Sequence, residues 1–223
     1  MYLIFFKFIK SIIDAVEKAG LSLPEDAKRT SLYLEWLERK TKYFDMEKQP
    51  VEVPYTVFPL KITQFAYSKN QPYVQDLIQK YYSVERKTTN FIANNLLNID
   101  AQDKRILLHN LVLLRGNVVW VDFGFNIGCE FGGKHPAVIL KNIGEVLIVT
   151  PITSGIITKP RQFEVIIDKV YNFSIRDRYT NITRITPISI YRVDLHSPIG
   201  SIRSENLKAI LEAINVEWHF SNE

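Results

Sequence analysis

The chain has 223 residues, of which 46% are hydrophobic and 23% are charged, so it can bury a sizeable core and is not intrinsically disordered. Its 28 basic and 24 acidic residues leave a net charge of +4, which suits a polyanionic partner without requiring one. The one cysteine excludes an intrachain disulfide framework and the cysteine-rich zinc motifs, and it favours a reducing, cytoplasmic location.

The first 20 residues are dense in apolar side chains, which raises the question of a signal peptide or membrane anchor. A membrane span needs about 20 apolar residues without charge, and this segment has neither that length nor a small-residue cleavage site. The pattern predicts an amphipathic helix packed on a core, with an interfacial helix as the alternative and no membrane-spanning segment. Its polar residues recur at helical spacing, and they are Lys7, Lys10, Ser11, Asp14, Glu17 and Lys18.

Helical patterns dominate the first hundred residues. The stretch LPEDAKRTSLYLEWLERKTKYF, residues 23–44, keeps its apolar residues at helical spacing. A proline-punctuated stretch over 49–67 indicates a linker or a short extended segment. Residues 70–98 are then expected to return to helix. We therefore predict a mainly helical N-terminal domain over residues 1–101.

Short β-rich runs replace the helical pattern near Leu114: NVVWVDF, PAVILKN, GEVLIVTPI, QFEVIID and NITRITPI. Because no helix lies between them to make parallel crossovers, we expect a small antiparallel barrel or half-barrel. Residues 204–218 predict a closing helix that covers the strands, with Ser204 able to cap it and Glu205 in its first turn. The expected fold class is α+β, with this second domain over 102–223.

The turn before one predicted strand contains several polar and charged side chains. In GCEFGGKHPAVIL, residues 128–140, the apolar run after the proline suits a buried strand. Burial of a strand does not explain the polar residues Glu130, Lys134 and His135 that precede or begin it. These three side chains therefore indicate a site.

The second half of the chain resembles the MazF/PemK/Kid toxins of type II toxin–antitoxin systems. The resemblance runs from about Arg115 to Ile214 and excludes the first hundred residues. Its motifs occur in the expected order: a glycine and an apolar strand ending in aspartate, then G-x-E-x-G-G-x-x-P, then P-x-T-S. The stretches that carry it are RGNVVWVDFGFNIGCEFGGKHPAVILKN, VLIVTPITSG, QFEVII, ITRITPISIYRV and IGSIRSENLKAILEAI.

The resemblance implies an SH3-like β-barrel with a C-terminal helix, usually a homodimer controlled by a cognate antitoxin. It also implies cleavage of single-stranded RNA without a metal or other cofactor, leaving a 2′,3′-cyclic phosphate and a 5′-hydroxyl. The family's catalytic arginine directly precedes the proline of the turn, where this sequence has His135. Thr153 matches the catalytic threonine, and Glu130 matches the acidic residue of the turn. His135 is thus a departure, and Lys134 beside it is a candidate for the missing cation.

The same residues suit RNA cleavage on chemical grounds. Attack by the 2′-hydroxyl needs a base for its proton, donors or a cation for the phosphate, and an acid for the leaving oxygen. Histidine transfers protons near neutral pH, so His135 is assigned as acid or base. Lys134 can contact phosphate as a point charge, and the hydroxyls of Thr153 and Ser154 can donate to it. Glu130 is expected to orient the basic groups.

Each assignment has a structural alternative. His135 alone could be a histidine bonded to a nearby carbonyl, and Glu130 could simply pair with Lys134 on the surface. Thr153 and Ser154 also suit a turn that ends a strand before a glycine. The lone Cys129 is expected to be a buried filler rather than a nucleophile. These readings stay open at the level of the sequence.

Basic residues with interleaved aromatic residues follow the P-x-T-S motif. Such a composition suits contacts to RNA phosphates and stacking on bases, although a solvated charged loop has the same composition. The expected RNA-binding residues, besides Ser154, are Lys159, Arg161, Arg176, Arg178 and Arg184.

Metal and nucleotide sites are not indicated. The four histidines show no pair at metal-ligand spacing, so we assign no metal and no cofactor. The glycine-rich stretch precedes a strand, whereas a dinucleotide or phosphate-binding loop would precede a helix. The sequence thus predicts a toxin-type endoribonuclease, and the alternative is a barrel that binds RNA or a partner but lost cleavage through the change to His135.

Overall fold

The computed structural model describes residues 10–16, 18, 25–126 and 131–218. Contacts divide the chain into two compact units, and each contains segments from both sides of residue 101. The first consists of Met1–Pro50 and Phe123–Gly133, and the second of Val51–Asp122 and Lys134–Glu223. The domain boundary between residues 101 and 102 stays a prediction, namely that the second domain folds alone.

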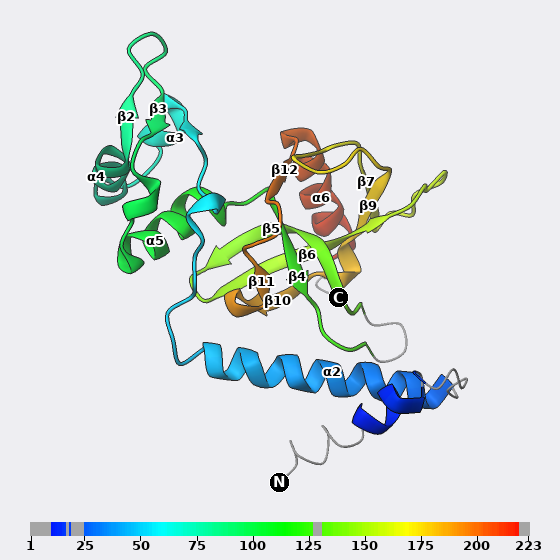
Figure 1. The fold of residues 1–223 in the computed structure, drawn as a ribbon. Helices are drawn as coiled ribbons and strands as arrows, with labels where there is room; N and C mark the ends of the chain where they lie inside the picture. Colours follow the sequence, from blue (N-terminus) through cyan, green and yellow to red (C-terminus); the bar gives the residue numbers. More distant parts are fainter. Residues whose placement is uncertain (1–9, 17, 19–24, 127–130, 219–223) are drawn as a thin grey trace. The chain divides into compact units, whose positions relative to one another are not determined.

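The first unit is built around helix α2, Glu25–Met46, which confirms the helical pattern in that stretch (Figure 1). Residues 10–16 are also helical. The ring of Tyr33 meets Phe125 edge-on at 5.3 Å between centroids. Gly124 has φ +92°, and a Cβ there would lie 2.8 Å from the Trp36 ring, so glycine is needed for this close approach. Helix α2 therefore packs on the segment that leads toward Lys134.

Residues 51–113 begin the second unit and contain more strand than the sequence predicted. Helix α4 starts with Pro72 in its first turn and buries Val74, Ile78 and Tyr81, as expected for its apolar spacing. The expectation that helix continues to residue 98 is wrong, because β2 and β3 pair there and β3 also pairs with β1. The elements are η1 Tyr55–Val57, β1 Lys61–Ile62, α3 Gln64–Ser68, α4 Pro72–Tyr81, β2 Tyr82–Val84, β3 Phe91–Ala93, η2 Leu96–Asn98, α5 Ala101–Leu107 and η3 Leu108–Val112.

The remainder of the second unit is a nearly closed antiparallel β-barrel with a C-terminal helix, as the sequence predicted (Figure 1). Its strand order is β7-β9-β6-β5-β4-β12-β8, with β10 also paired to β6 and β11 to β4. All of these pairs are antiparallel. The elements are β4 Asn117–Asp122, β5 Lys134–Ile143, β6 Val146–Ser154, β7 Glu164–Ile167, β8 Val170–Tyr171, β9 Arg178–Asn181, η4 Ile182–Arg184, β10 Thr186–Ser189, η5 Ile190–Arg192, β11 Val193–Asp194, β12 Gly200–Ile202 and α6 Ser204–Glu217.

The barrel core is aliphatic and is covered by α6. Ile210 of α6 is fully buried, and Leu207 packs beside it against the barrel residues. The predicted capping role of Ser204 is wrong, because the N-cap is Arg203 and the Ser204 hydroxyl donates to Glu205 instead. Glu205 does lie in the first turn. The buried barrel residues of this cluster are Val118, Val138, Ile152, Ile167, Val170, Ile182 and Ile202.

Candidate functional site

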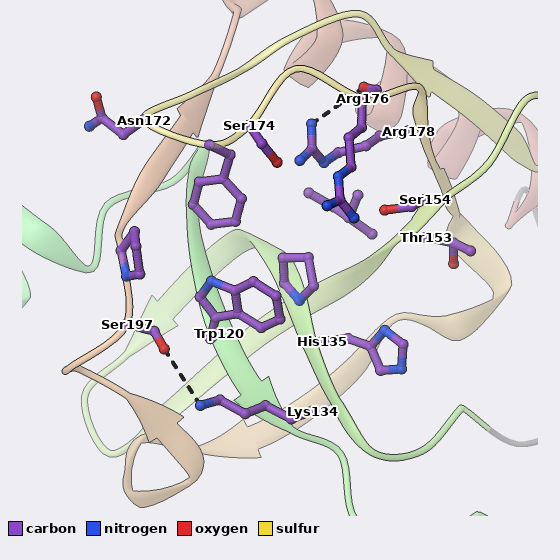
Figure 2. Close-up of a pocket in the computed structure, with 14 residues that line it drawn as sticks. Trp120, Lys134, His135, Thr153, Ser154, Asn172, Ser174, Arg176, Arg178 and Ser197 are labelled. Carbon is purple, nitrogen blue, oxygen red and sulfur yellow. Dashed lines mark hydrogen bonds between the residues drawn. The ribbon is translucent and has the colours of Figure 1, made fainter.

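A pocket of about 650 Å³ lies at one end of the barrel strands. Strands β4, β5 and β6 form one wall, and the segments before β9 and after β11 complete it (Figure 2). Six of the residues expected from the sequence line this pocket: Lys134, His135, Thr153, Ser154, Arg176 and Arg178. The barrel thus gathers side chains that are up to 44 positions apart in the chain.

His135 and Thr153 lie just beyond one end of the ladder between β5 and β6. The last paired positions at this end are Ala137 and Pro151, and two residues farther along each strand are His135 and Thr153. Both residues line the pocket, so an imidazole and a hydroxyl are available on its wall.

Lys134 has a carboxylate partner in the described structure. Its Nζ donates to Asp194 Oδ2 and lies 3.5 Å from Ser197 Oγ (Figure 2 shows the contact with Ser197). Burial raises the pKa of Asp194, but hydrogen bonds from Lys134, Ser197 and the His196 backbone N–H outweigh it and lower the pKa to about 2. The Asp194 carboxylate therefore balances the positive charge of Lys134.

Asp194→Asn should lower the free energy of unfolding at pH 7 by about 1 kcal/mol, the usual worth of charge-assisted hydrogen bonds after allowance for an Asp194 side chain that is 26% exposed. Because the folded pKa is depressed, this stability is present above the ordinary value of about 3.9 and is lost as pH falls toward 2. Urea unfolding at several pH values measures it. A difference that persists unchanged at pH 2 would contradict the assignment, and Asp168→Asn is the control at an exposed pair with Arg203.

Two arginines stand on the other wall of the pocket. Arg176 is exposed, whereas Arg178 at the start of β9 is only 6% exposed. The Arg178 Nη1 donates to the Arg176 carbonyl at 3.3 Å, and its guanidinium lies 5.8 Å from the centroid of the Phe173 ring. Burial, and then the like charge of Arg176, lower the pKa of Arg178.

Two aromatic rings complete the pocket. Trp120 of β4 stacks on Phe173 with a centroid distance of 5.9 Å and an angle of 10° between planes. In Figure 2 the Trp120 indole lies between Lys134 and the two arginines. A flat ring beside cations suits a nucleobase and its phosphate.

Some predicted residues do not join this constellation. Lys159 and Arg161 are exposed in the segment between β6 and β7, and Arg184 is exposed at the end of η4. None of the three lines the pocket. Glu130 and Cys129 lie outside the described residues.

Several pocket residues were missed by the sequence analysis. Trp120 sits in an apolar run that looks like core, and Ser197 comes from a segment without any motif, as does Asp194, which pairs with the pocket residue Lys134. Phe173 could have been suspected only from its position among basic residues. Asn172 also lines the pocket, in the left-handed conformation at φ +64°.

The described residues contain neither a candidate metal cluster nor a helix suited to crossing a membrane. They contain no cluster of three or more His, Cys, Asp or Glu side chains suited to a metal ion. None of the helices in the described part of the chain is long and apolar enough to cross a membrane.

The barrel region matches a known family of protein domains. A family model for the PemK-like, MazF-like toxin of type II toxin–antitoxin systems matches residues 114–217. This range agrees with the resemblance found in the sequence from about 115 to 214. No sequence among the curated proteins matches the chain.

Solved structures also resemble the barrel. MazF from Deinococcus radiodurans is 19% identical, with 46% of this chain and 93% of that chain covered and a TM-score of 0.38. An endoribonuclease in complex with its cognate antitoxin from a mycobacterial species is 16% identical, with coverage of 46% and 91% and a TM-score of 0.36. The Mycobacterium tuberculosis toxin MazF-mt6 is 17% identical, with coverage of 44% and 92% and a TM-score of 0.34.

Proposed function

We propose that the PemK-like, MazF-like toxin domain at residues 114–217 is an endoribonuclease that cleaves single-stranded RNA. The observation that carries the proposal is the pocket of this domain, in which His135 and Thr153 share one wall and arginines stand on the other. Proteins bind single-stranded RNA through basic side chains that contact its phosphates and aromatic rings that stack on its bases. A proton-transfer group beside them supports cleavage as well.

The proposed reaction is a transesterification that uses the substrate's own 2′-hydroxyl. The 2′-oxygen forms a bond to phosphorus as the bond from phosphorus to the 5′-oxygen breaks, which gives a 2′,3′-cyclic phosphate and a 5′-hydroxyl. One proton leaves the 2′-hydroxyl and one arrives at the 5′-oxygen. His135 carries one of these transfers, and water carries the other.

The other site residues act on the phosphate. The Thr153 and Ser154 hydroxyls donate to its oxygens, since both residues line the pocket. Lys134 is held by Asp194, so it contributes less charge than its sequence position suggests. Glu130 stays proposed as an orienting residue. Lys159, Arg161 and Arg184 are proposed to contact RNA outside the pocket.

The remaining parts of the proposal concern partners. We also propose that the protein binds a cognate antitoxin, assembles as a homodimer and acts in the cytoplasm. The solved relatives include a complex with an antitoxin, which supports the first of these.

Incubation of the purified full chain with a mixed RNA, in the presence of EDTA, tests the function. We expect discrete fragments from RNA and none from the same sequence carrying 2′-O-methyl groups, because the nucleophile is then blocked. RNA that is bound but left intact would reject the enzyme and favour the non-catalytic barrel. The variant His135→Ala controls for contaminating ribonucleases.

A further inference from the structure

Among the described residues, Arg178 is a buried cation without a carboxylate partner. It is 6% exposed, and within the described residues no Asp or Glu oxygen lies within ion-pair distance of its guanidinium. Its contacts are the Arg176 carbonyl at 3.3 Å and the Phe173 ring at 5.8 Å. Removing a charge from water without a counter-ion costs free energy. A bound anion would therefore stabilise the Arg178 side chain.

Other basic residues of the barrel do not share this property. Lys134 pairs with Asp194, Arg161 with Glu164 and Arg203 with Asp168. The exposed Arg176 lies beside Arg178 and lowers its pKa further through like charge, which makes the imbalance larger. In the described structure, Arg176 and Arg178 thus place two cations without a carboxylate partner at one wall of the pocket.

The ladder between β6 and β9 places Arg178 beside Ser154, one of the hydroxyl residues of the pocket. Ser154 is paired with Arg178 and Thr153 with Tyr179. Since directly opposed residues share a face of the sheet, the Ser154 side chain lies on the same face as Arg178. Figure 2 shows the Ser154 hydroxyl directed toward the side of the pocket that holds the two guanidinium groups.

We propose that Arg178, assisted by Arg176, binds the phosphate that undergoes cleavage and so supplies the cation that this chain lacks at position 135. The inference rests on the proposed function for the identity of its anion, a phosphate of the RNA backbone. A guanidinium suits this role because it stays protonated and donates two parallel hydrogen bonds to phosphate oxygens. The charge on the non-bridging oxygens is balanced by Arg178, while His135 transfers a proton.

The first experiment detects the anion site without requiring catalysis. The full chain is labelled with ¹⁵N-arginine, and the Nε–H signals are followed by NMR during titration with inorganic phosphate and, separately, with chloride at equal ionic strength. The Arg178 signal, assigned by its loss in Arg178→Lys and Arg178→Met, should shift and saturate with phosphate alone. The Arg203 signal should not move. An Arg178 signal that does not shift, or equal shifts at every arginine, would overturn the proposal.

The second experiment connects the site to RNA. Arg178→Met should weaken binding of a 2′-O-methyl oligonucleotide by about 10- to 100-fold, the usual effect of losing charge-assisted hydrogen bonds. Arg178→Lys should recover part of the affinity, and Arg203→Met should bind as the parent does. Wild-type affinity in both Arg178 variants contradicts the proposal, and Arg178→Lys carries the comparison if Arg178→Met does not fold.

The two experiments separate the inference from the function. If the parent leaves RNA intact but phosphate shifts the Arg178 signal, the endoribonuclease assignment fails and the anion site stands. If the parent and Arg178→Met cleave RNA at the same rate and phosphate moves no signal, the function stands and the role of Arg178 fails.

Discussion

His135→Ala is expected to lower the rate of RNA cleavage by about 10²- to 10⁴-fold, the usual contribution of a positioned acid or base. The reason is its place in the pocket, which Thr153 of the neighbouring strand also lines. Binding of a 2′-O-methyl oligonucleotide should change little, because phosphate contacts come from other side chains. Single-turnover cleavage and binding are measured on the same preparation.

The pH dependence identifies the chemistry of His135. An imidazole changes charge near neutral pH, so the rate of the parent should change within a unit or two of the ordinary histidine value of about 6.5. His135→Arg should remove this change while retaining part of the activity, because a guanidinium stays protonated across the range. Thr153→Ala should lower the rate and leave the pH dependence in place. A parent rate that is flat from mildly acidic to mildly basic pH returns His135 to a structural role.

Gly200→Ala is expected to destabilise the fold by about 3 kcal/mol, at the upper end of the usual effect of overpacking. A Cβ on Gly200 would lie 2.5 Å from the Tyr171 carbonyl oxygen and 2.8 Å from two atoms of the Phe173 ring. The carbonyl cannot yield easily, because it belongs to β8, which pairs with β12. The Phe173 ring would have to leave its stack on Trp120 and open the pocket.

Urea unfolding measures this effect, and near-ultraviolet circular dichroism reports the aromatic stack. Ser201→Ala, one residue farther along β12, is the matched control and should change stability little. Unfolding of Gly200→Ala at the parent's urea concentration would show that β12 can move away from β8 without cost, contrary to the packing described here. RNA cleavage should fall together with the loss of the aromatic signal.

Much of the barrel could be predicted from the sequence, because its strands are apolar runs separated by turn residues. The strands β2 and β3 were missed for a physical reason. Each has three residues, which is too short to display an alternating pattern, and they follow directly on the helical spacing of α4. Their pairing is a long-range property of the sheet.

The site was predicted where a local motif carried it and was missed elsewhere. Lys134 and His135 adjoin a glycine-rich turn, and Thr153 and Ser154 end a strand, so short stretches of sequence pointed to them. Asp194 neutralises Lys134 from 60 positions away, a pairing that no local pattern reveals. Arg178 has the same local charge pattern as the exposed Arg176, and only the fold distinguishes the buried cation from the solvated one.

The ends of the cleaved RNA test the central claim most directly. If the pocket acts through the substrate's 2′-hydroxyl, mass spectrometry of a defined oligonucleotide cleaved in EDTA should find a 2′,3′-cyclic phosphate on the upstream fragment and a 5′-hydroxyl on the downstream fragment. The His135→Ala variant should produce neither. Fragments with a 5′-phosphate, or parent-like cleavage by His135→Ala, would contradict the account.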